Sequence, residues 1–104
     1  TSLIYFDGTF SHGVLKSPRQ GDFRVQEEYG GVTRVIDHVP KRTLIAAEKI
    51  LKMLPALPNY ARIDMLVCPE KDILIEVELI EPDLFLTHSN QGAERFASSI
   101  LRRI

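Results

Sequence analysis

A chain of 104 residues, 44% of them hydrophobic, is long enough for one domain with a modest buried core. Its formal net charge of -1 excludes an overall basic surface of the kind that binds nucleic acids or membranes. The single cysteine, Cys68, excludes an internal disulfide, and no apolar run approaches the ~20 residues of a membrane span, so we expect a cytoplasmic protein. Because Thr1 opens directly into strand-like sequence, we expect a fragment of a longer protein.

The first part of the chain is predicted to form a β-hairpin. Residues 2–6 and 9–16 are the expected strands, and Asp7 and Gly8 lie between them. Both of these residue types tolerate a positive φ, which favours a tight two-residue turn. A loop that contains proline and glycine residues should follow, with a short strand near 23–27.

Two helices are predicted from apolar residues at helical spacing. The first begins at Pro40 and continues to about residue 54, just before Pro55. The second covers 91–104, and Ser89 or Asn90 is the expected N-cap residue. With the strands, these helices predict an α+β fold in which an antiparallel β-sheet is backed by two α-helices.

The segment 60–82 predicts a second hairpin with one arginine and three carboxylates on one face. Apolar and charged residues alternate along both strands, the apolar ones being Ile63, Met65, Val67, Ile73, Ile75, Val77 and Leu79. If both apolar rows are buried on one side, the numbers of any two residues that face each other across the hairpin must have an even sum. A three-residue loop at 69–71 meets this requirement. In that register Asp64 faces Glu76, and Arg62 faces Glu78.

The carboxylates of this hairpin are predicted metal ligands. Facing residues in a sheet lie roughly 4.5–5.5 Å apart at Cβ, close enough for Asp64, Glu76 and Glu78 to share a cation. Like charges about 4 Å apart repel by about 1 kcal/mol even in water, so a positive charge should accompany them. Ligands that are all oxygen favour Mg²⁺ or Mn²⁺. The alternative is a solvated polar face of the sheet with no bound ion.

Two segments resemble one enzyme family. Arg62-x-Asp64, with Glu76-x-Glu78 beginning 12 residues after the aspartate, resembles the end of the nucleotide site in ATP-grasp ligases. The family pattern is Arg-x-Asp followed by Glu-x-Asn, and this chain has Glu78 where most members have asparagine. Upstream, GDFR at 21–24 and the glycine pair at 30–31 are similar to a segment of the glutathione-synthetase-like and ribosomal-protein-modifying branches.

The resemblance implies that residues 1–104 form the C-terminal part of an ATP-grasp domain. By this resemblance the three carboxylates hold Mg²⁺ or Mn²⁺ that bridges the phosphates of ATP, and Lys16, Arg24 and Arg62 contact phosphate oxygens. Arg62 is also the expected catalytic residue, stabilising charge at the acyl centre. The implied reaction is ATP-dependent joining of a carboxylate to an amine or a thiol through an acyl phosphate. The isolated chain is expected to have little turnover.

Other functions and residues remain open at this point. A metal-dependent nuclease hairpin is one alternative, although Glu78 occupies the position of the nuclease lysine, and a noncatalytic α+β interaction domain is another. The expected partners are a nucleotide and small carboxylate and amine substrates, such as an amino acid or short peptide, with no nucleic acid and no membrane. Self-association into a homo-oligomer is a further expectation. His12, His38 and Cys68 are expected to be structural, and His88 is a weaker candidate for substrate contact.

Overall fold

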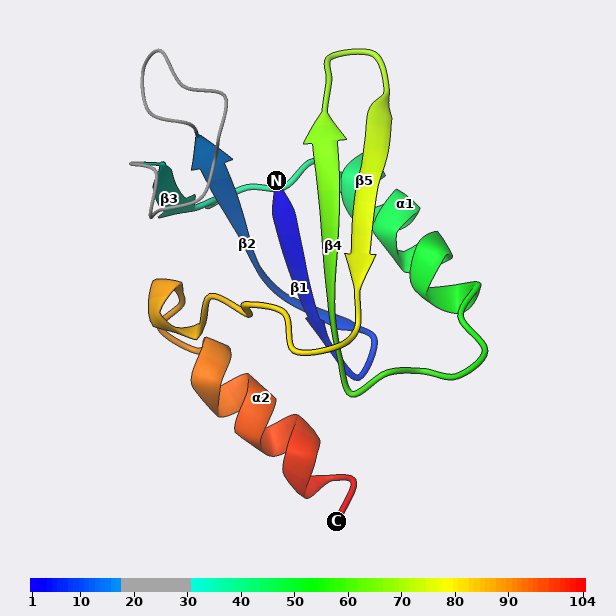
Figure 1. The fold of residues 1–104 in the computed structure, drawn as a ribbon, viewed down its shortest axis with the longest axis vertical. Helices are drawn as coiled ribbons and strands as arrows, with labels where there is room; N and C mark the ends of the chain where they lie inside the picture. Colours follow the sequence, from blue (N-terminus) through cyan, green and yellow to red (C-terminus); the bar gives the residue numbers. More distant parts are fainter. Residues whose placement is uncertain (18–30) are drawn as a thin grey trace.

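One antiparallel sheet organises the molecule in the computed structural model, which describes residues 1–17 and 31–104. Within these residues the elements are β1 (Ser2–Phe6), β2 (Thr9–Ser17), β3 (Val32–Val35), α1 (Lys41–Lys52), β4 (Tyr60–Val67), β5 (Asp72–Glu78), the short 3-10 helix η2 (Leu86–His88) and α2 (Gly92–Leu101). The strands lie in the order β3-β2-β1-β4-β5, and each neighbouring pair is antiparallel (Figure 1). The predicted α+β class, with two helices beside an antiparallel sheet, is confirmed.

The first hairpin forms as predicted. Asp7 and Gly8 connect β1 to β2 with φ values of 50° and 77°. These are left-handed conformations that a tight hairpin turn requires and that aspartate and glycine tolerate. β1 pairs with β2 on one side and with β4 on the other, so it is the central strand, and all five of its residues are buried.

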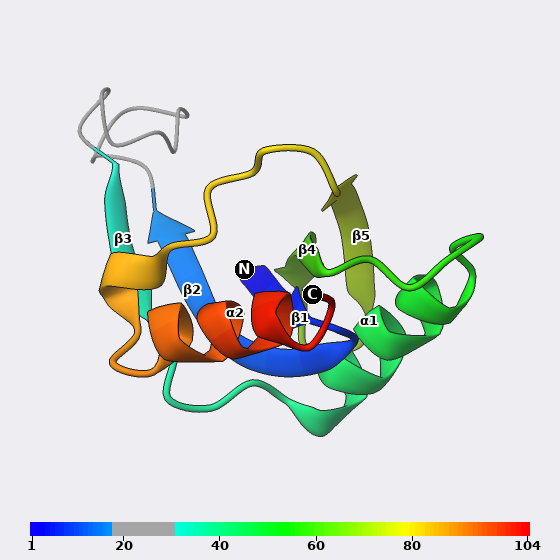
Figure 2. The same ribbon diagram turned by 90° about the horizontal axis from the view of Figure 1, so that it is seen from below.

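The two faces of the sheet bury different side chains. Leu3 on β1 packs on one face in a cluster with Ala47 and Leu51 of α1. Phe6 packs on the other face, where its ring stacks on Phe96 of α2 with centroids 4.9 Å apart. Figure 2 shows the segment after β5 passing over the side of the sheet that is opposite α1. This segment carries Phe85, which is buried in the same cluster as Phe6.

The second hairpin has the predicted register at its charged residues but a longer loop. Arg62 pairs with Glu78 and Asp64 with Glu76, as the alternation predicts. The strands end at Val67 and begin again at Asp72, so residues 68–71 form the loop in place of the expected three residues.

A bulge in β5 explains this difference. Asp64 pairs with Glu76, but the next residue, Met65, pairs with Leu74, which leaves Ile75 as an extra residue in the strand. The prediction that Ile73 and Ile75 are buried is wrong, since they are 44% and 64% exposed. β5 lies at the edge of the sheet, where the bulge turns these side chains to solvent.

The helices match their predicted positions, although their ends differ. Pro40 is the N-cap residue of α1 rather than its first residue. The expected cap of α2 is wrong: its N-cap residue is Gln91, and no side chain caps it. β3 is a short, mostly exposed strand that the sequence did not predict. The strand expected at 23–27 lies outside the described residues. No helix in the described part is both long enough and apolar enough to span a membrane.

Candidate metal centre

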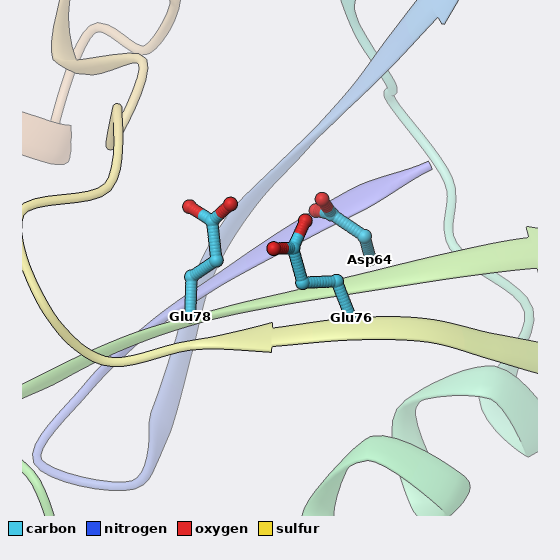
Figure 3. A group of neighbouring side chains, drawn as sticks. All are labelled: Asp64, Glu76 and Glu78. Atoms are coloured by element: carbon cyan, nitrogen blue, oxygen red, sulfur yellow. The ribbon is translucent and has the colours of Figure 1, made fainter.

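Three carboxylates from two strands meet on one face of the sheet. Asp64 comes from β4, and Glu76 and Glu78 come from β5; one oxygen atom of each lies within 4.8 Å of those of the other two. Figure 3 shows the three side chains projecting from the same side of the hairpin. Asp64 and Glu78 are partly buried, whereas Glu76 is exposed, so a ligand can approach from solvent. The structure thus brings together all three residues that the sequence predicts as metal ligands.

Arg62 lies beside the carboxylates and holds them in place. Its side chain is 8% exposed, and its Nε and Nη2 atoms each donate to one Asp64 oxygen at 3.0 Å. Nη2 also lies 3.0 Å from Oε1 of Glu78, and Nη1 donates to the carbonyl oxygen of Asp83 at 3.3 Å. The two parallel bonds to Asp64 use the planar fork that distinguishes arginine from lysine. One guanidinium balances only one of three carboxylates.

The charge balance of the cluster shows in Glu78. Burial raises the pKa of Glu78, and the charge of Arg62 opposes this rise. A hydrogen bond between the Glu78 and Glu76 carboxyl groups, and the negative charges of Glu76 and Asp64, raise this pKa further. A raised pKa means that the site disfavours a third negative charge when no further cation is near. An all-oxygen donor set that lacks positive charge fits a hard divalent cation such as Mg²⁺ or Mn²⁺.

A second cation reaches the same region from β2. The Nζ atom of Lys16 lies 5.1 Å from the centre of the Phe85 ring, and the Cζ atom of Arg62 lies 5.7 Å from it. Phe85 is 5% exposed and has φ of 50°, a left-handed conformation that is uncommon for a bulky residue. Two predicted phosphate contacts, Lys16 and Arg62, therefore share one aromatic ring. The third, Arg24, lies outside the described residues.

The sequence did not predict that Phe85 lies at this site. Its contacts depend on how the segment after β5 folds back across the sheet. Local sequence patterns do not predict the course of that segment. The His88 and Phe85 rings also form a T-shaped pair with centroids 5.9 Å apart, which places His88 next to the site.

His12 has a structural environment, as expected. It is 6% exposed, its Nδ1 lies 2.7 Å from the Ser11 hydroxyl, and its Nε2 lies 2.9 Å from the carbonyl oxygen of Leu84. Burial lowers the pKa of His12, while its backbone contact with Leu84 opposes that change. With both ring nitrogen atoms engaged, the His12 side chain ties β2 to the segment that carries Phe85.

Comparisons with known proteins show that this chain is similar to ligases. No protein-family model matches the chain. The chain is 31% identical, over its whole length, to the cycloserine biosynthesis protein DcsG of Streptomyces lavendulae and covers 37% of that protein. The crystal structure of the D-cycloserine synthetase DcsG matches 98% of this chain and 37% of its own, with a TM-score of 0.79 and 26% identity.

A second solved structure also has a fold similar to that of this chain. The D-alanine–D-alanine ligase from Bacillus anthracis matches 98% of this chain and 39% of its own, with a TM-score of 0.63 and 19% identity. Both proteins are ATP-grasp ligases, and this chain spans less than two fifths of the length of either. The five-stranded antiparallel sheet and its two helices match the C-terminal part of that fold. The chain is homologous to these ATP-grasp ligases, and its fold matches a C-terminal fragment of theirs.

Proposed function

We propose that the protein is an ATP- and Mg²⁺-dependent ligase that joins a carboxylate to an amine, and that this chain supplies its metal- and phosphate-binding face. The observation that carries the proposal is the meeting of Asp64, Glu76 and Glu78 within 4.8 Å on one face, beside Arg62. Homology to ATP-grasp ligases supports it.

The carboxylates are the proposed metal ligands. They would hold Mg²⁺ or Mn²⁺, which would supply positive charge to neutralise the transferred phosphoryl group. Arg62, which contacts Asp64 and Glu78, is the proposed phosphate contact nearest to these ligands. Lys16 lies on the same face and is a second phosphate contact; Arg24 is proposed from the sequence alone.

The proposed reaction has two steps. In the first, a substrate carboxylate oxygen attacks the γ-phosphorus of ATP, which forms an acyl phosphate and releases ADP. In the second, an amine attacks the acyl carbon, forming an amide bond and releasing phosphate. Arg62 is the proposed catalytic residue, which stabilises the negative charge that develops on the acyl oxygen in this step. No covalent protein nucleophile is required.

The substrates are proposed to be amino acids or short peptides. The names of the compared proteins refer to cycloserine synthesis and to the joining of two D-alanine molecules. An amino acid presents both the carboxylate and the amine that this chemistry consumes.

Calorimetric titration of the chain with a nonhydrolysable ATP analogue tests the proposal. We expect binding that requires Mg²⁺ and that is lost in Glu76→Gln, which removes one ligand charge with little change of shape. Glu70→Gln is the matched control, because Glu70 is an exposed glutamate in the turn of the same hairpin. Binding that is independent of Mg²⁺, or equal in the two variants, would contradict the assignment of these carboxylates.

A further inference from the structure

Lys16 and Arg62, two proposed phosphate contacts, are held by different kinds of neighbour. Arg62 is fixed by charge, since its guanidinium lies 3.0 Å from oxygen atoms of Asp64 and Glu78. The ammonium of Lys16, near the end of β2, lies over an aromatic ring, with its Nζ atom 5.1 Å from the centre of the Phe85 ring. Lysine has a long, flexible stem, so placing its charge in a binding site costs conformational entropy unless a neighbour holds it. Phe85 is a neighbour that can hold it.

The ring of Phe85 is itself fixed by hydrogen bonds of its own segment. Phe85 has φ of 50°, a conformation that persists only where the surrounding structure enforces it. The Asp83 carboxylate accepts a hydrogen bond from the backbone N–H of Phe85 at 2.8 Å, and the Asp83 carbonyl oxygen accepts one from Arg62 at 3.3 Å. The carbonyl oxygen of Leu84 lies 2.9 Å from Nε2 of His12. These contacts tie the segment to both β2 and β4 and so determine where the ring lies.

The strand pairing places Lys16 on the same face of the sheet as the predicted metal ligands. Val14 of β2 packs with Phe85, and Lys16 lies two residues further along the same strand, so both side chains take one face. Ser2 of β1 pairs with Val14 on one side and with Asp64 on the other. Residues that pair across strands share a face, so the Lys16 side of β2 is the Asp64 side of β4.

An aromatic ring suits a cation that must also bind phosphate. The negative face of the ring attracts an ammonium, yet the ring carries no net charge. A carboxylate in the same place would neutralise Lys16, accept its N–H donors and repel an incoming phosphate. The ring of Phe85 can therefore orient the ammonium and leave its charge to the phosphate oxygens.

We propose that Phe85 is a positioning residue, whose ring holds the ammonium of Lys16 on the Asp64 face for contact with nucleotide phosphates. Arg62 lies beside it, with its Cζ atom 5.7 Å from the centre of the same ring. Phe85 itself contacts neither phosphate nor metal. The statement that the ring holds Lys16 stands on the structure alone, and the statement about phosphates rests on the proposed function.

The chemical shifts of lysine protons test the first statement by NMR. Protons over the face of an aromatic ring move upfield, so the ε-methylene protons of Lys16 should resonate upfield of those of Lys49 and Lys52, which are exposed on α1. Phe85→Leu should remove this difference. Phe96→Leu is the matched control, because it removes a ring that packs against the same cluster, and it should leave the difference in place. Ordinary Lys16 shifts in the unmodified chain would overturn the proposal, as would an equal change in both variants.

A double-mutant cycle tests the statement about phosphates. Phe85→Leu should weaken binding of the nonhydrolysable ATP analogue with Mg²⁺ by roughly 2–30-fold, the range that a cation–π contact supplies. Lys16→Met keeps the apolar stem and removes the ammonium. In the Lys16→Met chain, Phe85→Leu should have no further effect, because it acts through the lysine. Equal weakening by Phe85→Leu with and without the lysine would overturn the positioning role.

Two further measurements separate this proposal from the metal site. Mn²⁺ affinity without nucleotide should be the same in Phe85→Leu and in the unmodified chain, since the three carboxylates are retained, and a matching loss of Mn²⁺ affinity would overturn a role through Lys16. Normal binding of the analogue by Phe85→Leu would also overturn it while leaving the site intact. Absence of analogue binding in the unmodified chain would overturn the proposed function and the statement about phosphates together. The shifts of Lys16 would still decide whether the ring holds it.

Discussion

The two hairpins of the sheet contrast a register that is set locally with one that depends on contacts elsewhere. In β1–β2 the turn residues Asp7 and Gly8 adopt the conformations that close the hairpin, and β1 is buried on both faces. In β4–β5 the longer loop is bonded to Arg42 of α1, a bulge interrupts the pairing at Ile75, and β5 lies exposed at the sheet edge. The candidate site occupies the second hairpin. A buried hairpin supplies stability, and an exposed edge strand leaves carboxylates within reach of ligands.

Truncating one apolar residue in each hairpin should give the largest difference. Leu3→Ala removes a fully buried side chain from β1 and should lower the free energy of unfolding by about 2–5 kcal/mol. Ile75→Ala removes a side chain that is 64% exposed and should change it by less than about 0.5 kcal/mol. Urea unfolding of both variants measures the difference. Equal losses would mean that β5 is packed as tightly as β1.

Removing the arginine of the site should have the next largest effect. Arg62→Met leaves Asp64 and Glu78 without their shared cation, and breaking a buried ion pair costs about 3–5 kcal/mol. Both carboxylates are partly exposed, so solvent screening weakens this ion pair. We therefore expect Arg62→Met to lower the free energy of unfolding by about 2–3 kcal/mol. Millimolar Mg²⁺ should restore part of this loss in thermal unfolding. No recovery with Mg²⁺ would show that the cation does not bind these carboxylates.

The two turns should respond differently to alanine. Gly8 has φ of 77°, and a Cβ atom there would lie 2.9 Å from Cδ1 of Leu57, so Gly8→Ala should cost about 1–2 kcal/mol. Glu70→Ala in the exposed turn of β4–β5 should stay within about 0.5 kcal/mol. Chemical unfolding of both variants is the measurement, and an equal cost would contradict a locally determined first hairpin.

The smallest expected effect is a pH dependence that belongs to the second hairpin. Since the pKa of Glu78 is raised in the folded chain, its contribution to stability is fully present at low pH and is lost as pH rises through the folded value. Glu78→Gln should therefore become more stable than the unmodified chain as pH rises through that range, without Mg²⁺. Unfolding measured at several pH values checks the sign, and a difference that grows toward low pH would contradict it.

Much of the site could be predicted from the sequence because strand alternation fixes faces. Arg62 and Asp64 alternate with apolar residues on β4, and Glu76 and Glu78 do so on β5. This alternation was sufficient to predict that Arg62 pairs with Glu78 and Asp64 with Glu76, as the structure shows. The first turn was predictable for a similar reason, since Asp7-Gly8 has a strong local preference.

What the sequence did not predict depends on contacts between distant residues. The strand that carries the bulge at Ile75 is bonded to a distant helix, since Asp72 accepts a hydrogen bond from Thr43 of α1, 29 residues earlier in the chain. The ring of Phe85 meets Lys16 and Arg62 only because the segment after β5 crosses back over the sheet. β3 is short and exposed, so its sequence has little of the alternation that indicates a strand.

The most direct test of the central claim is to locate Mn²⁺ on the chain by its broadening of NMR signals. We predict that signals around Asp64, Glu76 and Glu78 broaden first, that signals around Asp7 stay sharp, and that Glu76→Gln abolishes the effect. Asp7 is a suitable internal control because its carboxylate is already paired with Arg102 and Arg103. Broadening centred elsewhere, or spread equally over the acidic residues, would contradict a metal centre on the second hairpin.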